Sequence, residues 1–260
     1  MEIIQSLKNP KVKSWVSLKM KQGRMEQGVY LIEGFKLVEE AIRSKVDIQS
    51  IIYGMEHEIP FSWQPWIQQS DISLYQVSQS IIEKLTDTKT PQGFYAIIEQ
   101  KKNSLEDLIN KRFLLLVDEV QDPGNLGTII RSADAAGIEA IVLGKGTVDV
   151  YNGKVIRSAM GSMFHVPFVE ADLTQVILKL QDKGFIVVGT SPHTEKNYFE
   201  LDYKQRMAII VGNESKGLSE IRIEQVDQMV KIPFMGMAES LNVAIATAII
   251  LFERVRQLSE

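Results

Sequence analysis

The stretch Ile232-Pro-Phe-Met-Gly-Met-Ala-Glu-Ser-Leu-Asn-Val-Ala-Ile-Ala246 decides the fold of this 260-residue chain. It completes a strand-like run, Met229 to Ile232, that Pro233 stops. The triplet Ser240-Leu-Asn242 then opens a long apolar segment, which predicts a helix from 241 to 258. Ser and Asn side chains accept hydrogen bonds from the unpaired N–H groups of a helix start. Polar residues beyond a strand end lie where open α/β sheets bind ligands.

Upstream of this stretch, apolar runs alternate with helical patterns from about residue 105 onward. The apolar runs predict strands at 113–118, 138–143, 166–169, 185–190 and 207–211. The helical patterns predict helices at 126–136, 151–160 and 173–183. Strands that alternate with helices imply a parallel sheet covered by helices on both faces.

The first hundred residues predict a smaller α/β unit, in which strands and helices alternate less regularly than they do after residue 105. Apolar residues recur at helical spacing and predict one amphipathic helix over Leu31, Ile32, Phe35, Val38, Ala41 and Ile42. Further elements are expected as strands at 48–53, 73–77 and 93–99 and a helix at 79–85. The polar stretch from 100 to 103 is a plausible linker. We therefore expect two domains, residues 1–100 and residues 105–260.

The charge of the chain is unevenly distributed. Its net charge is -4, yet residues 1 to 28 hold six Lys or Arg against two Glu, so this segment carries +4 and the remainder -8. A basic segment that also contains Trp15 suits an RNA phosphate backbone. A solvated amphipathic helix explains the same charges equally well.

Composition excludes several classes of protein. The absence of cysteine removes disulfides, thiolate metal sites and a cysteine nucleophile, and it fits a reducing cytoplasm. No apolar run reaches about 18 residues, so no membrane span is expected. The three histidines are far apart and predict no metal site. The chain contains neither a dinucleotide-binding glycine motif nor a P-loop. It therefore lacks the phosphate-binding loop of the usual dinucleotide-binding enzymes and P-loop nucleotidases.

Three polar segments follow predicted strand ends. In chain order they are Asn125-x-Gly127-x-x-x-Arg131, Gly212-x-Glu214-x-x-Gly217 and Ile232-Pro233-x-x-Gly236-x-x-x-Ser240-Leu241-Asn242-Val243. In the first segment we expect Asn125 to cap the following helix. Taken singly, the segments have ordinary explanations: a solvated helix arginine, a common loop and a capped helix.

Taken together, the three segments resemble the SpoU type of the SPOUT RNA methyltransferases over roughly residues 105 to 258. The stretches 6–13 and 29–42 resemble the start of the ribosomal-protein-like substrate-binding domain of such enzymes. The resemblance implies a parallel sheet whose last part threads a trefoil knot, an exception to the usual unknotted topology. It also implies a homodimer, S-adenosylmethionine as methyl donor and an RNA ribose 2′-hydroxyl as acceptor.

The resemblance also assigns residues to the site. Arg131 matches the residue that activates the ribose hydroxyl, and the polar set around it is Asn125, Glu214, Ser240 and Asn242. The matching cofactor-binding positions are Gly212, Ile232 and Leu241, and Thr190 at a strand end is expected to line the same pocket. One departure is Ala244, where many members carry Ser.

The chemistry favours a limited role for Arg131. A ribose hydroxyl is a poor nucleophile, so methyl transfer needs in-line positioning and partial deprotonation. An arginine pKa above about 12 makes a poor base, so positioning and charge stabilisation are favoured. The leading domain favours ribosomal RNA over transfer RNA. A transfer RNA methyltransferase, a non-catalytic RNA-binding assembly factor and a small-molecule enzyme remain alternatives.

Overall fold

The computed structural model describes all residues from 1 to 260 and divides into two compact units. Unit 1 comprises Met1–Lys101 and Tyr151–Phe164, and unit 2 comprises Lys102–Val150 and His165–Glu260. The first division falls within the linker expected at residues 100 to 103. The segment Tyr151–Phe164 is part of unit 1 although it lies between two stretches of unit 2.

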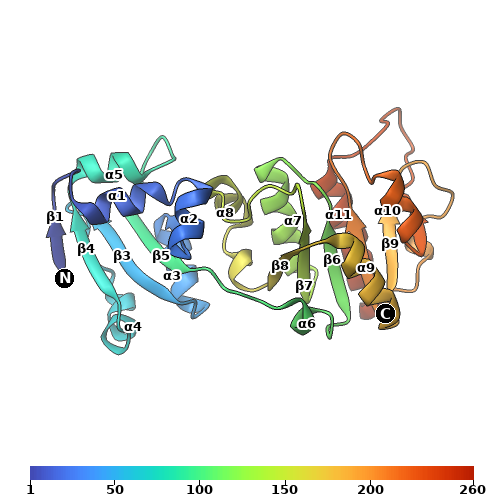
Figure 1. Ribbon diagram of the computed structural model, residues 1–260, viewed down its shortest axis with the longest axis horizontal. Helices are drawn as coiled ribbons and strands as arrows, with labels where there is room; N and C mark the ends of the chain where they lie inside the picture. Colours follow the sequence, from blue (N-terminus) through green and yellow to red (C-terminus); the bar gives the residue numbers. More distant parts are fainter. The chain divides into compact units, whose positions relative to one another are not determined.

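Unit 1 is built on a five-stranded mixed sheet (Figure 1). In sheet order its strands are β1 (Glu2–Ile4), β4 (Ser73–Val77), β3 (Ile48–Gly54), β5 (Phe94–Glu99) and β2 (Val29–Glu33). The first three run parallel, and β5 is antiparallel to both of its neighbours. The helices are α1 (Pro10–Ser17), α2 (Lys21–Gln27), α3 (Phe35–Arg43), α4 (Gln64–Gln69), α5 (Gln79–Leu85) and α8 (Gly153–Ala159), with 3-10 turns η1 (Phe61–Trp63) and η2 (Ser162–Phe164).

The leading segment contributes to the core of unit 1. Helix α1 packs with α5 against the sheet, and this cluster includes Val12, Trp15, Leu18, Ile81, Leu85 and Ile52. The Trp15 side chain is 5% exposed, and its ring lies 5.1 Å from that of Tyr75. Trp15 is therefore a packing residue, and of the leading segment only the exposed side chains are open to an RNA backbone.

The helix predicted to include Leu31 and Ile32 was also wrong at its start. These residues belong to β2, which pairs with β5, and α3 begins only at Phe35. The two elements meet at Gly34, whose φ of 112° is a conformation that residues with a side chain rarely adopt. The β-branched and aromatic residues before Gly34 favour a strand over a continuous helix.

Unit 2 is built on a six-stranded sheet in which every pairing is parallel (Figure 1). In sheet order its strands are β11 (Gln228–Val230), β9 (Ile186–Thr190), β10 (Met207–Val211), β6 (Phe113–Val117), β7 (Ala140–Gly144) and β8 (Phe168–Ala171). The helices are α6 (Leu105–Leu108), α7 (Pro123–Ala135), α9 (Leu173–Asp182), α10 (Glu220–Gln225) and α11 (Val243–Ser259), with the 3-10 turn η3 (Tyr198–Glu200). The predicted α/β fold with a parallel sheet is confirmed.

Both faces of the unit 2 sheet are covered. Alternate strand residues such as Leu114, Leu116 and Ile210 pack against Val176 and Leu180 of α9. The residues between them, such as Leu115 and Ile209, are also fully buried, on the face that α7 and α11 cover (Figure 1). No helix in the structure has the combination of length and apolar character that a membrane crossing requires.

The strand register places the loops that carry the three polar segments at one edge of this sheet. Val211 aligns with Val117, and Val230 aligns with Thr190. Because all strands are parallel, their carboxyl ends meet at the same edge. The loops that follow β6, β10 and β11, which carry the three polar segments, therefore leave from that edge together.

Candidate functional site

The first polar segment forms the start of α7. Asp122 is the N-cap, and its Oδ1 accepts a 2.8 Å hydrogen bond from the Asn125 backbone N–H. Pro123 occupies the first turn, where the missing N–H costs nothing. The prediction that Asn125 caps this helix was therefore wrong, because Asp122 takes that role. The Asn125 side chain is consequently available for contacts with other segments.

The third polar segment ends at the start of α11, where Asn242, one of the two cap residues that the Ser-Leu-Asn triplet offers, is the N-cap, so the helix begins at Val243 rather than at 241. Asn242 Oδ1 accepts hydrogen bonds from the backbone N–H groups of Ala244 at 2.9 Å and Ile245 at 3.4 Å. Since the oxygen is committed to the helix, the amide Nδ2 points outward. It donates a 2.8 Å hydrogen bond to Asn125 Oδ1.

Glu214 of the second segment completes a chain of hydrogen bonds. Asn125 Nδ2 donates to Glu214 Oε1 at 3.0 Å. The backbone N–H groups of Asp122 and Gln121 donate to the same carboxylate at 3.0 and 3.2 Å. The side chains of Asn242, Asn125 and Glu214 thus form one relay that joins all three polar segments.

The relay keeps Glu214 ionised. Partial burial alone raises the pKa of this carboxyl, but the hydrogen bonds from Asn125 and the Asp122 and Gln121 backbone outweigh it, so the pKa lies below its ordinary value. A carboxylate with a lowered pKa is a weak base. The arrangement therefore suits Glu214 for holding the loop after β6 rather than for accepting a proton.

A close backbone approach explains Gly212. A Cβ placed on Gly212 would lie 2.4 Å from the carbonyl carbon and oxygen of Gly217 and 2.6 Å from the Leu218 nitrogen. The turn between them is closed by backbone hydrogen bonds in both directions between Asn213 and Gly217, of 3.1 and 2.9 Å. Asn213 Nδ2 also donates to the Glu119 carbonyl at 2.9 Å. Asn213, which the sequence did not single out, thus ties this loop to the end of β6.

The other two residues assigned to the chemistry lie outside this chain of hydrogen bonds. Arg131 is exposed on α7, and the hydrogen bonds that join Asn125, Glu214 and Asn242 do not include it. Ser240 is exposed in the loop before α11. The relay is therefore formed by three of the five residues that the sequence assigns to the chemistry.

The loop from 232 to 241 carries two of the predicted cofactor positions, the half-buried Ile232 and Leu241. No residue of this loop donates or accepts a hydrogen bond, so its backbone N–H and C=O groups are available to a ligand. Thr190, half-buried at the end of β9, directs its hydroxyl to the Ile210 carbonyl at 3.5 Å. These features suit a heteroaromatic base that is read by backbone groups, and the adenine of S-adenosylmethionine meets that requirement.

An ion pair that the sequence did not reveal supports the same edge of the sheet. Asp118, 7% exposed at the end of β6, lies 3.3 Å from Arg222 Nε of α10. Burial raises the pKa of Asp118, and the Arg222 charge partly opposes this. Arg222 Nη1 also donates to Thr174 Oγ1 of α9 at 2.8 Å. No sequence pattern predicted α10, so this contact could not be inferred.

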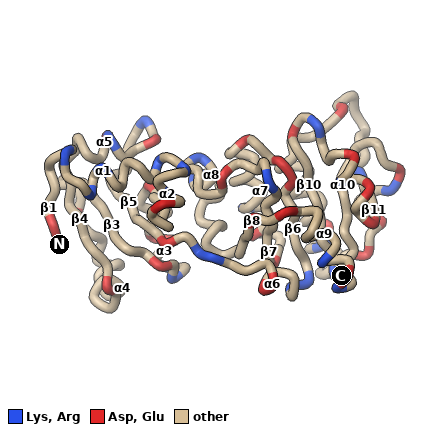
Figure 2. The backbone as a smooth tube through the Cα atoms, viewed as in Figure 1, with Lys and Arg blue, Asp and Glu red and all other residues tan.

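Half of the cations in the leading segment serve the structure of unit 1. Arg24 is 4% exposed, and its Nη1 donates to the Leu18 and Lys19 carbonyls at the end of α1. Lys19 pairs with Asp87 at 2.8 Å, and Lys11 pairs with Glu2. The cations that extend from the surface without an ion pair are Lys8, Lys13 and Lys21. Basic and acidic positions are interspersed along unit 1 (Figure 2).

Comparison with known proteins identifies both units. The SpoU rRNA methylase family matches residues 112–252, and the MRM3-like substrate binding domain matches residues 9–96. The 23S rRNA (guanosine(2553)-2′-O)-methyltransferase RlmP of Bacillus subtilis is 42% identical over 252 residues, covering 97% of this chain and 98% of the relative. The AdoMet-bound rRNA methyltransferase of Sinorhizobium meliloti has a TM-score of 0.88 and 33% identity, with 98% of each chain covered. The AdoMet complex of AviRb from Streptomyces viridochromogenes has a TM-score of 0.85 and 28% identity, covering 97% of this chain and 99% of that one. The chain belongs to the SpoU rRNA methylase family.

Proposed function

We propose that this protein transfers a methyl group from S-adenosylmethionine to a ribose 2′-hydroxyl of ribosomal RNA. The observation that carries the proposal is the Asn242–Asn125–Glu214 relay, which joins the three family segments at the carboxyl edge of a parallel sheet. The Bacillus subtilis relative is named for a guanosine of 23S rRNA, so a guanosine of the large ribosomal RNA is the acceptor we favour. Comparing the ribose methylations of total RNA with and without the gene tests the choice, and a loss confined to transfer RNA would contradict it.

We assign the cofactor to Gly212, Ile232 and Leu241, with Thr190 lining the same site. The unbonded backbone groups of the 232–241 loop support the assignment, as does the tight turn that Gly212 permits. When bound, S-adenosylmethionine supplies the methyl group as part of a sulfonium. The protein contributes orientation, because a methyl transfer requires acceptor oxygen, carbon and sulfur in line.

Arg131 is assigned to the ribose hydroxyl. Its guanidinium, fixed on α7 after the Asp122 cap, holds the 2′-oxygen and stabilises the negative charge that develops there. Ser240 and Asn242 bind polar groups of the RNA next to this oxygen. Asn125 and Glu214 act as positioning residues, since their hydrogen bonds hold the start of α7 against the start of α11.

The first expected result concerns the cofactor. Purified protein should bind S-adenosylmethionine or its demethylated product with a dissociation constant near 1 μM or weaker, about -8 kcal/mol or less favourable. Isothermal titration calorimetry measures this directly. Neither heat nor a shift in unfolding temperature at millimolar cofactor would contradict the assignment and leave a non-catalytic RNA-binding assembly factor as the better description.

We further propose that the segment from β11 to α11 threads a trefoil knot and that two copies associate through α11. Two apolar side chains on this helix, Ile245 and Phe252, are 53% and 46% exposed. They lie seven residues apart, about two turns, and so share one helix face. An exposed apolar pair on a helix whose other side contributes Ala244, Ile250 and Leu251 to the core supports a two-fold interface. An experimental trace in which the chain does not pass through a preceding loop would refute the knot.

The second expected result concerns assembly. Light scattering at micromolar concentration should give a mass of about twice 29.4 kDa. Ile245→Glu with Phe252→Glu should yield monomers, because burying two charges at an interface is unfavourable. Leu178→Glu, a change of a half-exposed residue on α9, is the matched control and should remain dimeric. A monomeric wild-type protein would contradict the proposal.

Unit 1 is proposed to bind the RNA. The proposed location is the cytoplasm, where ribosomal RNA is made in bacteria.

The structure determines how RNA binding by the leading segment, residues 1 to 28, can be tested. Deleting residues 1 to 28 would remove Val12, Trp15 and Leu18 from the core, so lost binding would report unfolding rather than lost charge. Substitutions of exposed cations avoid this problem.

A further inference from the structure

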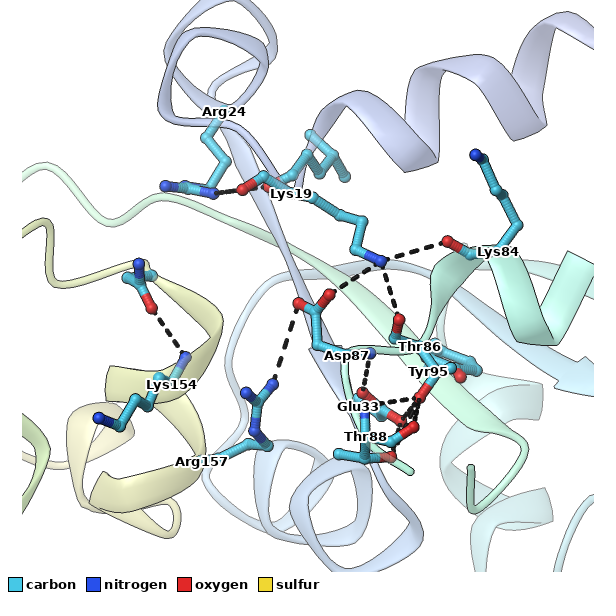
Figure 3. A network of polar contacts seen from close by, with 12 residues as sticks. Lys19, Arg24, Glu33, Lys84, Thr86, Asp87, Thr88, Tyr95, Lys154 and Arg157 are labelled. Carbon is cyan, nitrogen blue, oxygen red and sulfur yellow. Dashed lines mark hydrogen bonds and ion pairs between the residues drawn. The ribbon is translucent and has the colours of Figure 1, made fainter. Parts of the chain in front are cut away.

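A polar network holds the loop that follows α5, residues 86–92, against β2 (Figure 3). Glu33, the last residue of β2, accepts hydrogen bonds from the Thr86 and Thr88 hydroxyls through Oε1. Its Oε2 accepts a 3.2 Å hydrogen bond from the Asp87 backbone N–H. One carboxylate therefore fixes three consecutive residues of loop 86–92.

Lys19 fixes the loop from another side. Its Nζ donates to the carbonyls of Thr86 at 2.8 Å and Lys84 at 3.3 Å and pairs with Asp87 Oδ1 at 2.8 Å. At the far end of the loop, Gln92 Oε1 accepts from the Phe35 N–H at 3.0 Å. Loop 86–92 is thus ordered before any ligand arrives, which lowers the entropic cost of binding.

Arg157 of α8 approaches the same network. Its Nη1 lies 4.0 Å from Asp87 Oδ2, and the side chain is 33% exposed. A Cβ on Gly153 would lie 3.2 Å from both of these atoms, so the glycine leaves room for their approach. Asp87 is already hydrogen-bonded to Lys19, so its charge is shared between two cations and compensates Arg157 only in part.

Positive charge lies next to this network. The network itself contains two acids (Glu33 and Asp87) and two cations (Lys19 and Arg157), and the chain adds Lys84 just before loop 86–92 and Lys89 within it. Lys84 and Lys89 are exposed and make no ion pair. Figure 3 shows the Lys84 ammonium directed away from Asp87.

We propose that Lys84, Lys89 and Arg157 form a phosphate-binding surface on unit 1 for the backbone of the RNA substrate; this rests on the proposed function. Lys19 is excluded from the surface because its ammonium is committed to loop 86–92. Helix α8 follows the carboxyl end of β7 after residues 145–152.

The test measures how RNA affinity depends on salt. The probe is a transcript of 23S ribosomal RNA centred on guanosine 2553, the position named for the Bacillus subtilis relative. The logarithm of the RNA association constant falls as the logarithm of the salt concentration rises. Each lost phosphate contact reduces the steepness of this fall by about 0.7 for single-stranded RNA. The triple variant K84Q/K89Q/R157Q should therefore reduce the steepness by about 2. The double variant K84Q/K89Q, which leaves the contacts of Asp87 intact, should reduce it by about 1.4.

The matched control is K111Q/K183Q/K204Q, which removes the same charge from exposed positions of unit 2 that precede β6, β9 and β10, at the amino ends of these strands. It should keep the wild-type slope, and all variants should keep the wild-type unfolding temperature and cofactor affinity. An unchanged slope in K84Q/K89Q, or an equal loss in the control, would overturn this surface while leaving the methyltransferase proposal intact. If wild-type protein binds cofactor but no RNA, the RNA substrate of the proposed function fails, and this surface fails with it.

Discussion

Arg131→Ala is expected to lower the single-turnover rate of ribose methylation at least about 100-fold, equivalent to about 2.7 kcal/mol. The reason is that removing one group that stabilises transition-state charge costs this much in well-studied enzymes. The hydrogen bonds that join Asn125, Glu214 and Asn242 do not involve Arg131, so the mutation should leave them in place. Cofactor affinity should change by less than about threefold.

The matched control is Arg112→Ala, an exposed arginine immediately before β6 at the opposite end of that strand from the site. This variant should retain the wild-type rate. Because an interaction made only in the transition state affects kcat and kcat/KM alike, both parameters should fall together in Arg131→Ala. A rate within about tenfold of wild type would identify Arg131 as an ordinary helix-surface arginine.

Gly212→Ala should abolish cofactor binding at concentrations that saturate the wild type. The added Cβ would overlap the Gly217 carbonyl, so the turn from 213 to 217 must move. That movement displaces Glu214 and breaks the relay at its acidic end. Overpacking of this kind costs about 1–3 kcal/mol, so the unfolding temperature should also fall. Calorimetric titration and thermal unfolding measure the two effects.

Gly236→Ala is the corresponding control, because a Cβ at Gly236 meets nothing within 4 Å. It lies in the same set of loops at the sheet edge and should unfold at the wild-type temperature. If Gly212→Ala binds cofactor as tightly as the wild type does, the turn is not part of the cofactor site.

The sequence predicted the sheet edge that carries the candidate site because apolar runs and cap residues are recognisable within short stretches of chain. Strand β10 was predicted with its observed bounds because it is a continuous apolar run, and a cap was predicted at Ser240 or Asn242 because both precede a long apolar helix. Three polar segments beyond strand ends then had to lie along one edge of the sheet if its strands are parallel. The roles of Arg131, Ser240 and the cofactor positions remain predictions.

The contacts that the sequence did not reveal join residues far apart in the chain. Nothing near Tyr151 indicates that its ring packs 4.6 Å from that of Tyr30. The pairing of Asp118 with Arg222 depends on α10, a six-residue helix too short for a clear periodic pattern. Leu31 and Ile32 fit a helical spacing by coincidence, and only pairing with β5 decides that they form a strand.

The segment Tyr151–Phe164 delays the folding of unit 1 during translation. A ribosome completes residues 1–101 first, but the rest of unit 1, the segment Tyr151–Phe164 whose Tyr151 ring packs on Tyr30 of β2, is complete only after another 63 residues (164 minus 101) have been made. At about 5–20 residues per second, this delay lasts about 3–13 s. During that interval the nascent chain exposes an apolar strip that the finished protein buries. Unit 1 can therefore finish folding only after residues 102–150, which belong to unit 2, have also been made.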